Sequence, residues 1–367
     1  MQNDITTIKQ FAHDWRVKNA DIKQQLTNDG SISENIWRKL GQDGLLGVQL
    51  DEQYGGCSLT TADMCALVEE LAYLSPSLAL SVVAHSNLCG QLINRFGSPH
   101  QKQLYLPKLC QGQIIGAIGI SEDTAGSDAL SMKTSIHPDG DHWRLNGHKM
   151  WITNGPIADI FVIYAKDHEL RIKAVLVPKS AGIITDKPLE KFGMRQSPTC
   201  RISFNHIPIQ SDQIIPGDGL SILKSGLHEE RLVLSAIPIA IMRRCLDEMI
   251  SYTLSRNQFG QALASKQIIQ KHLSSCHVKL SSCRALLNES LKQKPCGISA
   301  ASCYLHASEC ATQVANTCMD IFGGYGYMTE SGIPELLADA KLFQTGGGTE
   351  IIRSLIIGHA LTGIKAY

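Results

Sequence analysis

The hydrophobic periodicity of this chain changes twice, and the order of these changes limits the folds open to it. Apolar residues recur at helical spacing up to about residue 112, short β-type runs follow to about residue 216, and long helical segments then return. No βαβ alternation occurs, which excludes a Rossmann or TIM fold. The pattern predicts an α+β, mostly α protein with an N-terminal helical domain (1–112), a middle β domain (113–216) and a C-terminal helical domain (217–367) built as a four-helix bundle.

The same periodicities predict the individual elements. Helices are expected over residues 5–26, from residue 33, and over 61–74, 77–96, 98–110, 219–255, 265–293, 297–322 and 349–364. Strands are expected over residues 114–120, 142–145, 160–164, 174–177 and 201–204, separated by Gly, Pro and Asp-Gly turns.

Composition excludes several classes of function. Lys plus Arg and Asp plus Glu both number 34, and no basic run interleaved with aromatic residues occurs, so nucleic acid is not an expected partner. No apolar run approaches the roughly 20 residues that span a bilayer, and Met1-Gln2-Asn3-Asp4 lacks a basic leader pattern; we expect a soluble, cytoplasmic protein with no membrane contact. The 12 cysteines and 13 histidines form no Cys-x-x-Cys or His-x-x-x-His set, so buried free thiols are expected and no metal site is predicted.

The longest predicted helix carries two adjacent carboxylates in a mostly apolar run. Glu230 shares a helical face with Gly226, Leu227, Val233 and other apolar residues. A carboxylate removed from water without a neighbouring cation has a raised pKa, which suits a general base near pH 7. The alternative is that Glu229 and Glu230 are solvated or pair with arginines, and the helix alone leaves both interpretations open.

Two loops suggest a cofactor site. The segment Gly119-Ile120-Ser121-Glu122-Asp123-Thr124-Ala125-Gly126-Ser127-Asp128 follows a predicted strand, and its small and hydroxyl residues can present N–H and oxygen groups to a polar ring or phosphate. It resembles the Ser-Glu-x-x-Ala-Gly-Ser-Asp signature of the acyl-CoA dehydrogenase family. Further stretches resemble that family in the same order: Lys149-Met150-Trp151-Ile152-Thr153-Asn154-Gly155, Arg256-Asn257-Gln258-Phe259-Gly260 with Gln267, and Phe322-Gly323-Gly324-Tyr325-Gly326-Tyr327.

The resemblance covers essentially the whole chain and is closest to the isovaleryl-CoA dehydrogenase subgroup. The stretches that carry the subgroup likeness are Ala84-His85-Ser86-Asn87-Leu88-Cys89, Gly193-Met194-Arg195-Gln196-Ser197-Pro198-Thr199-Cys200 and Glu230-Arg231-Leu232-Val233-Leu234. It implies an FAD-dependent oxidoreductase of leucine catabolism, usually a homotetramer in which one subunit grips the FAD pyrophosphate of another. Electron-transferring flavoprotein is the implied electron acceptor.

The resemblance also implies the site residues. The implied FAD-binding set is Ile118, Ile120, Ser121, Gly126, Ser127, Trp151, Ile152, Thr153, Arg256, Phe259, Gln267, Asp320, Phe322, Gly323, Gly324, Thr349 and Ile351. The implied substrate-binding set is Ser127, Ser221, Leu227, Arg231, Gly347 and Gly348.

The base needs a separate argument, because many family members carry it near the C-terminus in a Tyr-Glu-Gly-Thr segment. Here that stretch reads Gln344-Thr345-Gly346-Gly347-Gly348-Thr349, so glycine stands where the glutamate would be. The subgroup match assigns the role to Glu230, while Glu350 is expected to be a first-turn acid of the last helix. The implied reaction takes the α-proton of a thioester to Glu230 and the β-hydrogen as hydride to flavin N5.

Three functions remain open at this point. The first is dehydrogenation of a short branched acyl-CoA such as isovaleryl-CoA. The second is dehydrogenation of an acyl or aminoacyl group tethered to a carrier protein in natural-product biosynthesis. The third is a non-catalytic scaffold, suggested by Ala338, which replaces a common arginine of the family. A second departure from the family pattern is Asp123-Thr124, which replaces a Pro-containing pair.

Overall fold

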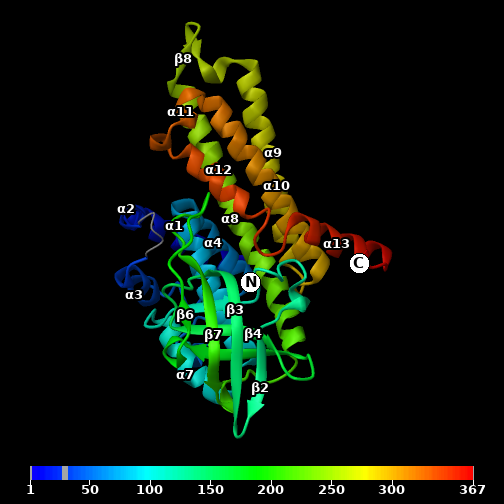
Figure 1. The fold of residues 1–367 in the computed structure, drawn as a ribbon. Coiled ribbons are helices and arrows are strands. Elements are labelled where there is room, and N and C mark those ends of the chain that lie inside the picture. The colour runs from blue at the N-terminus through cyan, green and yellow to red at the C-terminus, as the bar shows by residue number, and fades with distance from the viewer. Residues whose placement is uncertain (1, 27–31, 367) are drawn as a thin grey trace.

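The computed structural model describes residues 2–26 and 32–366 as helices, then a sheet, then helices (Figure 1). Residues 1, 27–31 and 367, which fall within the first and third predicted domains, lie outside the described part of the chain. The N-terminal helices are α1 (Gln2–Lys18), α2 (Ile22–Gln25), α3 (Glu34–Gln42), α4 (Thr61–Leu74), α5 (Pro76–Val82), the π-helical turn η2 (Val83–Gly90), α6 (Gln91–Phe96) and α7 (Pro99–Cys110).

The middle of the chain forms one seven-stranded sheet. Its strands are β1 (Gly116–Gly119), β2 (Ser135–Asp139), β3 (His142–Thr153), β4 (Ile160–Lys166), β5 (Ile172–Pro178), β6 (Ile184–Thr185) and β7 (Thr199–Ile209). The order is β1-β4-β2-β3-β7-β6, with β5 also paired to β4. Every predicted strand is present. Strands β2 and β6 were not predicted, because Ser135-Ile136-His137-Pro138-Asp139 is largely polar and β6 has only two residues.

Long helices dominate the rest of the chain. They are α8 (Gly219–Ser255), α9 (Gln267–Ser290), α10 (Gly297–Phe322), α11 (Gly324–Tyr327), α12 (Ile333–Leu342) and α13 (Glu350–Thr362), with a small hairpin of β8 (Asn257–Gln258) and β9 (Gln261–Ala262). The 37 residues of α8 span about 55 Å. In Figure 1 this helix runs from the sheet to the far tip of the bundle, where the hairpin lies.

Local side-chain chemistry explains where several helices begin. Thr60 and Asp63 form a capping box at the start of α4, and Ser98 and Gln101 form one at the start of α7. The predicted starts after residue 33 and at residue 61 are therefore confirmed, as are the full ranges of α8 and α10.

Two helix predictions were wrong in detail. The predicted helix 5–26 is interrupted after Lys18, where the Asn19 side chain donates to the Trp15 carbonyl (2.7 Å) and competes with the helical ladder. The predicted helix 77–96 contains η2, in which His85 accepts a hydrogen bond from the Gly116 amide (3.0 Å) and pairs with the Leu109 carbonyl (3.1 Å). Burial lowers the pKa of His85 to about 4, so this ring is neutral and joins the first helices to β1.

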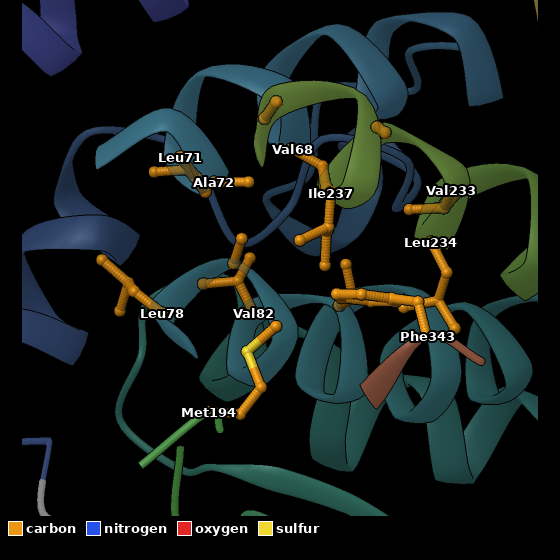
Figure 2. Close-up of a cluster of buried hydrophobic side chains, with 14 of the residues drawn as sticks. Val68, Leu71, Ala72, Leu78, Val82, Met194, Val233, Leu234, Ile237 and Phe343 are labelled. Atoms are coloured by element: carbon orange, nitrogen blue, oxygen red, sulfur yellow. The ribbon is translucent and has the colours of Figure 1, made fainter. Parts of the chain in front are cut away.

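The three parts of the chain share a buried core. Figure 2 shows apolar side chains of α4, α5 and α8 meeting Met194 of the sheet region and Phe343, which follows α12. The labelled members are Val68, Leu71, Ala72, Leu78, Val82, Met194, Val233, Leu234, Ile237 and Phe343. Because Val233 and Leu234 lie one helical turn after Glu230 on α8, this core holds the region of the predicted base.

The cysteines are free, as predicted, and all but Cys57 and Cys296 are buried. Within residues 2–26 and 32–366, no helix is long and apolar enough to cross a membrane.

Candidate active site

Helix α8 places Glu229 and Glu230 side by side in the interior, 6% and 7% exposed. The helix starts at Asp218, whose carboxylate accepts from the Ser221 amide (3.0 Å) and hydroxyl (2.6 Å). Burial of adjacent acids is costly unless each is paired or neutralised. The two glutamates meet this requirement in different ways.

Glu229 forms an ion pair and hydrogen bonds that link the N-terminal helices to α8. Its carboxylate accepts from Arg95 Nη1 (2.8 Å), Gln49 Nε2 (2.6 Å) and Thr61 Oγ1 (3.3 Å). Gln49 in turn accepts from Asn87 Nδ2 (3.0 Å). These partners occupy the lone pairs of Glu229, which suits a structural role.

Glu230 is the carboxylate without such partners. Its Oε2 atom is buried and makes no hydrogen bond to any residue that the structure describes. Burial raises the pKa of Glu230 to about 7, and the charge of Arg231 offsets part of that rise. A carboxyl group poised near neutral pH, with a free oxygen, is suited to accept a proton from a bound molecule.

The loop at Gly346–Gly348 lies beside this carboxylate and admits no side chain at its centre. Tyr304 donates from its hydroxyl to the Gly346 carbonyl (2.9 Å), and Arg231 donates from Nε to the Gly347 carbonyl (3.2 Å). Gly347 has φ +65°, and a Cβ there would lie 2.9 Å from the Tyr304 ring and 3.1 Å from Leu234. A glutamate at 347 is thus excluded in this conformation. Two carboxylates remain near this loop: Glu230 on α8, and Glu350 at the start of α13, whose Oε1 atom is also buried without a partner among the described residues.

Two tyrosines near Glu230 were missed by sequence reasoning. Burial raises the pKa of both Tyr164 and Tyr304, and the Glu230 charge adds to that rise. The Tyr164 hydroxyl is buried without a partner. A tyrosine within the otherwise apolar run of β4 was the one available signal for Tyr164.

The loop after β1 is held by a buried ion pair. The Lys149 ammonium, fully buried, donates to the Ile120 carbonyl (2.9 Å) and to Glu122 Oε1 (3.0 Å). Glu122 also accepts from the amides of Lys133 (2.7 Å) and Thr134 (2.9 Å). The pair therefore fixes the path of the loop that carries Ser121, Gly126 and Ser127; in that loop Gly126 and Ser127 are exposed. His148 contacts Asp123 (2.7 Å), which gives the unusual Asp123 a local partner.

Trp151 is turned outward beside this loop. The β3–β7 register shifts between Lys149 and Ile152, and Trp151 adopts φ +59° with 54% of its surface exposed. Ile152 is buried and offers only its backbone, and Thr153 is half-buried. An exposed aromatic face next to a loop of small residues fits a flat ring system such as isoalloxazine.

The remaining predicted FAD contacts lie far from these. Arg256 caps the C-terminus of α8, about 39 Å along the helix from Glu230. Phe259 in the hairpin turn is 92% exposed. Added Cβ atoms at Gly323 and Gly324 would meet nothing within 4 Å, so backbone there is open to approach. Arg256, Phe259, Gly323 and Gly324, together with Gln267, Asp320 and Phe322, form a group that we call the tip set. Gln267 and Asp320 are exposed, and Phe322 is half-buried and stacked on Tyr252, with ring centroids 4.1 Å apart.

The other predicted contacts are distributed along α8 and α13. Leu227 lies one turn before Glu230 and is half-buried, whereas the Ser221 hydroxyl is exposed and bound to Asp218. Thr349 caps α13 by accepting from the Ile352 amide (3.3 Å), and Glu350 is the first residue of that helix, as predicted. Ile351 is exposed. One chain thus brings together Glu230, Arg231, Gly347 and Gly348 but leaves the tip set apart.

Known proteins resemble this chain over nearly its whole length. Three family models match in order: "Acyl-CoA dehydrogenase, N-terminal domain" over residues 6–113, "middle domain" over 117–207 and "C-terminal domain" over 217–362. The chain is 38% identical to the mitochondrial isovaleryl-CoA dehydrogenase of Bos taurus over 96% of this chain and 86% of that protein.

Solved structures also resemble this chain over almost its whole length. A glutaryl-CoA dehydrogenase from Mycobacterium smegmatis in complex with FADH2 has a TM-score of 0.94 at 26% identity, covering 100% of this chain and 96% of that one. The prolyl acyl carrier protein oxidase AnaB has a TM-score of 0.90 at 29% identity, covering 98% and 97%.

Proposed function

We propose that this chain, which belongs to the acyl-CoA dehydrogenase family of FAD-dependent oxidoreductases, dehydrogenates a short branched acyl-CoA such as isovaleryl-CoA, with Glu230 as the base. The observation that carries the proposal is the buried Glu230 carboxylate with a free oxygen, next to a loop where glycine replaces the other possible base. Identity to isovaleryl-CoA dehydrogenase supports the branched short-chain substrate.

In the proposed reaction, a side chain of the protein accepts a proton from the substrate. The Glu230 carboxylate takes the α-proton of the thioester at Oε2, and its pKa near 7 lets it be both ionised and basic at neutral pH. Arg231 and Tyr304 hold the Gly346–Gly348 loop beside it. Bound FAD supplies the acceptor for the β-hydrogen and its electron pair, so the product is an α,β-unsaturated thioester. Electron-transferring flavoprotein is the proposed acceptor that reoxidises it.

The FAD-binding residues support a site shared between subunits. Trp151, Thr153 and the loop that Lys149 and Glu122 hold would take the isoalloxazine, with Gly126 and Ser127 exposed at the surface of that loop. Arg256 and Gln267 would take the pyrophosphate of a second subunit, because the length of α8 between Glu230 and Arg256 is too great for one cofactor to meet both ends within one chain. A homo-oligomer, proposed as a tetramer, follows.

A second candidate function is dehydrogenation of a thioester on a carrier protein. The likeness to the prolyl acyl carrier protein oxidase, over nearly the full length of both chains, favours it. The scaffold alternative is disfavoured by family membership and by the intact buried carboxylate.

Anaerobic titration of the FAD-loaded protein separates the two candidates. Isovaleryl-CoA is expected to bleach the flavin absorbance stoichiometrically, while the same acyl group on a carrier protein leaves it unchanged. Bleaching by carrier-bound thioesters alone would select the second candidate. A flavin that no thioester in a panel of short acyl and aminoacyl groups reduces would contradict both.

A further inference from the structure

A cluster of two thiols and an imidazole lies in the seam between α9 and α10. Cys283 of α9 and His306 and Cys310 of α10 each present a donor atom, and these atoms all lie within 4.8 Å of one another. Cys283 and Cys310 are buried, and His306 is half-buried. None of the three belongs to the proposed catalytic, substrate-binding or FAD-binding set.

The spacing of Cys310 and His306 matches the edge of a metal tetrahedron. With metal–sulfur and metal–nitrogen bonds of about 2.3 and 2.0 Å, a tetrahedral ion places sulfur and nitrogen about 3.5 Å apart and two sulfurs about 3.8 Å apart. The Cys310 sulfur lies 3.7 Å from His306 Nδ1 and 3.9 Å from Nε2. His306 and Cys310 are four residues apart on one helix, so both point to the same side, toward α9.

A hydrogen bond to Ser282 fixes the orientation and tautomer of the His306 ring for metal binding. The Ser282 hydroxyl donates to the Lys279 carbonyl (2.9 Å), so its oxygen is left to accept from His306 Nε2 (3.0 Å). That contact places the ring proton on Nε2 and leaves a lone pair on Nδ1, which lies 3.7 Å from the Cys310 sulfur. Ligating histidines are commonly oriented in this way by a group bound to the other ring nitrogen.

We propose that Cys283, His306 and Cys310 bind a thiophilic divalent ion of the zinc class, with water at the fourth position on the half-buried His306 side. Two thiolates and an imidazole are a donor set that such ions prefer over oxygen-seeking cations. Binding releases the two thiol protons and ties α9 to α10 by coordinate bonds, so the ion stabilises the bundle rather than taking part in the flavin chemistry.

Cobalt(II) titration of the FAD-loaded protein with its thiols reduced tests the site. Thiolate-bound cobalt has absorption bands at wavelengths longer than those of the flavin, so the two signals can be separated. The wild-type protein is expected to take up one cobalt per chain, which Zn²⁺ then displaces, and to melt at a higher temperature with Zn²⁺. His306→Ala and Cys283→Ser should lose the cobalt bands and the thermal shift, and Ser282→Ala should weaken binding about tenfold.

Cys303→Ser is the matched control. Cys303 is buried on the same helix, but its thiol contacts Ser290 Oγ (3.0 Å) and the Leu286 carbonyl (3.4 Å), outside the cluster. It should bind cobalt as the wild type does. The flavin spectrum of each variant reports that it has folded. Either of two results would overturn the proposal. Cobalt bands could persist in His306→Ala and Cys283→Ser, or the wild type could take up no cobalt because Cys283 and Cys310 form a disulfide again after reduction.

Discussion

At the scale of single residues, the two neighbouring glutamates of α8 have opposite environments. Glu229 is satisfied by Arg95, Gln49 and Thr61, whereas Glu230 has a free buried oxygen. The same residue type thus links two parts of the structure at position 229 and is the proposed base at position 230. Substitutions that remove only the charge separate these roles.

Glu230→Gln is expected to retain bound FAD but to lose flavin reduction by isovaleryl-CoA by about 10²- to 10⁴-fold, the usual contribution of a general base. Glu229→Gln should keep most of the activity and lose roughly 1–3 kcal/mol of stability, because Arg95 is left with a weaker partner. Stopped-flow flavin reduction and thermal unfolding measure the two effects. Equal loss of activity in both variants would contradict the assignment.

The pH dependence of flavin reduction follows from the raised pKa of Glu230. The base acts when ionised, so the single-turnover rate should rise with pH up to about 7 and then level off. Glu229→Gln is the control and should keep this profile. A rate that stays constant over about three pH units around that pKa would argue against Glu230 as the proton acceptor.

At the scale of elements, the second half of α12 shows the consequence of Ala338. Asp339 is buried, and burial raises its pKa to about 7, while Arg244 and Lys191 offset only part of that rise. The Met194 amide donates to its Oδ1 atom. The backbone carbonyl of Ala338 packs directly against Gly193. Because residue 338 is alanine, Asp339 has no arginine directly before it on its own helix.

Asp339→Asn is expected to stabilise the protein at alkaline pH. A folded-state pKa above the ordinary 3.8 means that this carboxyl favours folding most below pH of about 4, and that the contribution is lost as pH rises through about 7. The upper limit of the cost is on the order of 4 kcal/mol. Melting temperatures of variant and wild type should therefore coincide near pH 4 and diverge above pH 7, with exposed Asp141→Asn as the unchanged control.

The loop after β1 depends on the Lys149–Glu122 pair. Lys149→Met leaves a buried carboxylate without its cation and should cost about 3–5 kcal/mol. Bound FAD should be lost during gel filtration, because Glu122 also holds the amides of Lys133 and Thr134. In the double variant with Glu122→Gln, the loss of stability should be smaller than the sum of the single losses. An additive result would show that the pair does not act as a unit.

At the scale of the whole molecule, the length of α8 separates the proposed base from the tip residues. Figure 1 shows the β8–β9 hairpin at the end of the bundle remote from the sheet. If Arg256 serves the site of a second subunit, each complete site needs two chains. Exposed apolar side chains at the tip, including Phe259 and Tyr327, agree with contact to another copy.

Subunit complementation tests this arrangement. Glu230→Gln and Arg256→Ala are each expected to be inactive alone, the first in proton removal and the second in FAD retention. When the two chains are co-expressed, random pairing should restore about a quarter of the wild-type sites, because half of the pairs are mixed and each mixed pair holds one intact site. No recovery in mixed pairs would place both residues in the same site.

The sequence by itself determined the order of helices and strands, the bounds of α8 and α10, and the absence of a carboxylate at Gly347. These features are local: periodicity, capping residues and glycine positions act within a few residues of chain. Membership of the family followed from motif order, which the family models confirm.

Only the tertiary structure distinguished Glu229 from Glu230, because Arg95 lies 134 residues from Glu229 in sequence. Only the packing of α9 on α10 brought Cys283 to His306 and Cys310, where spacing rules for metal ligands found nothing. The physical reason is the same in both cases. The pKa of a buried carboxylate and the ligand set of a metal depend on which distant side chains share its low-dielectric surroundings, and a one-dimensional pattern does not contain those contacts.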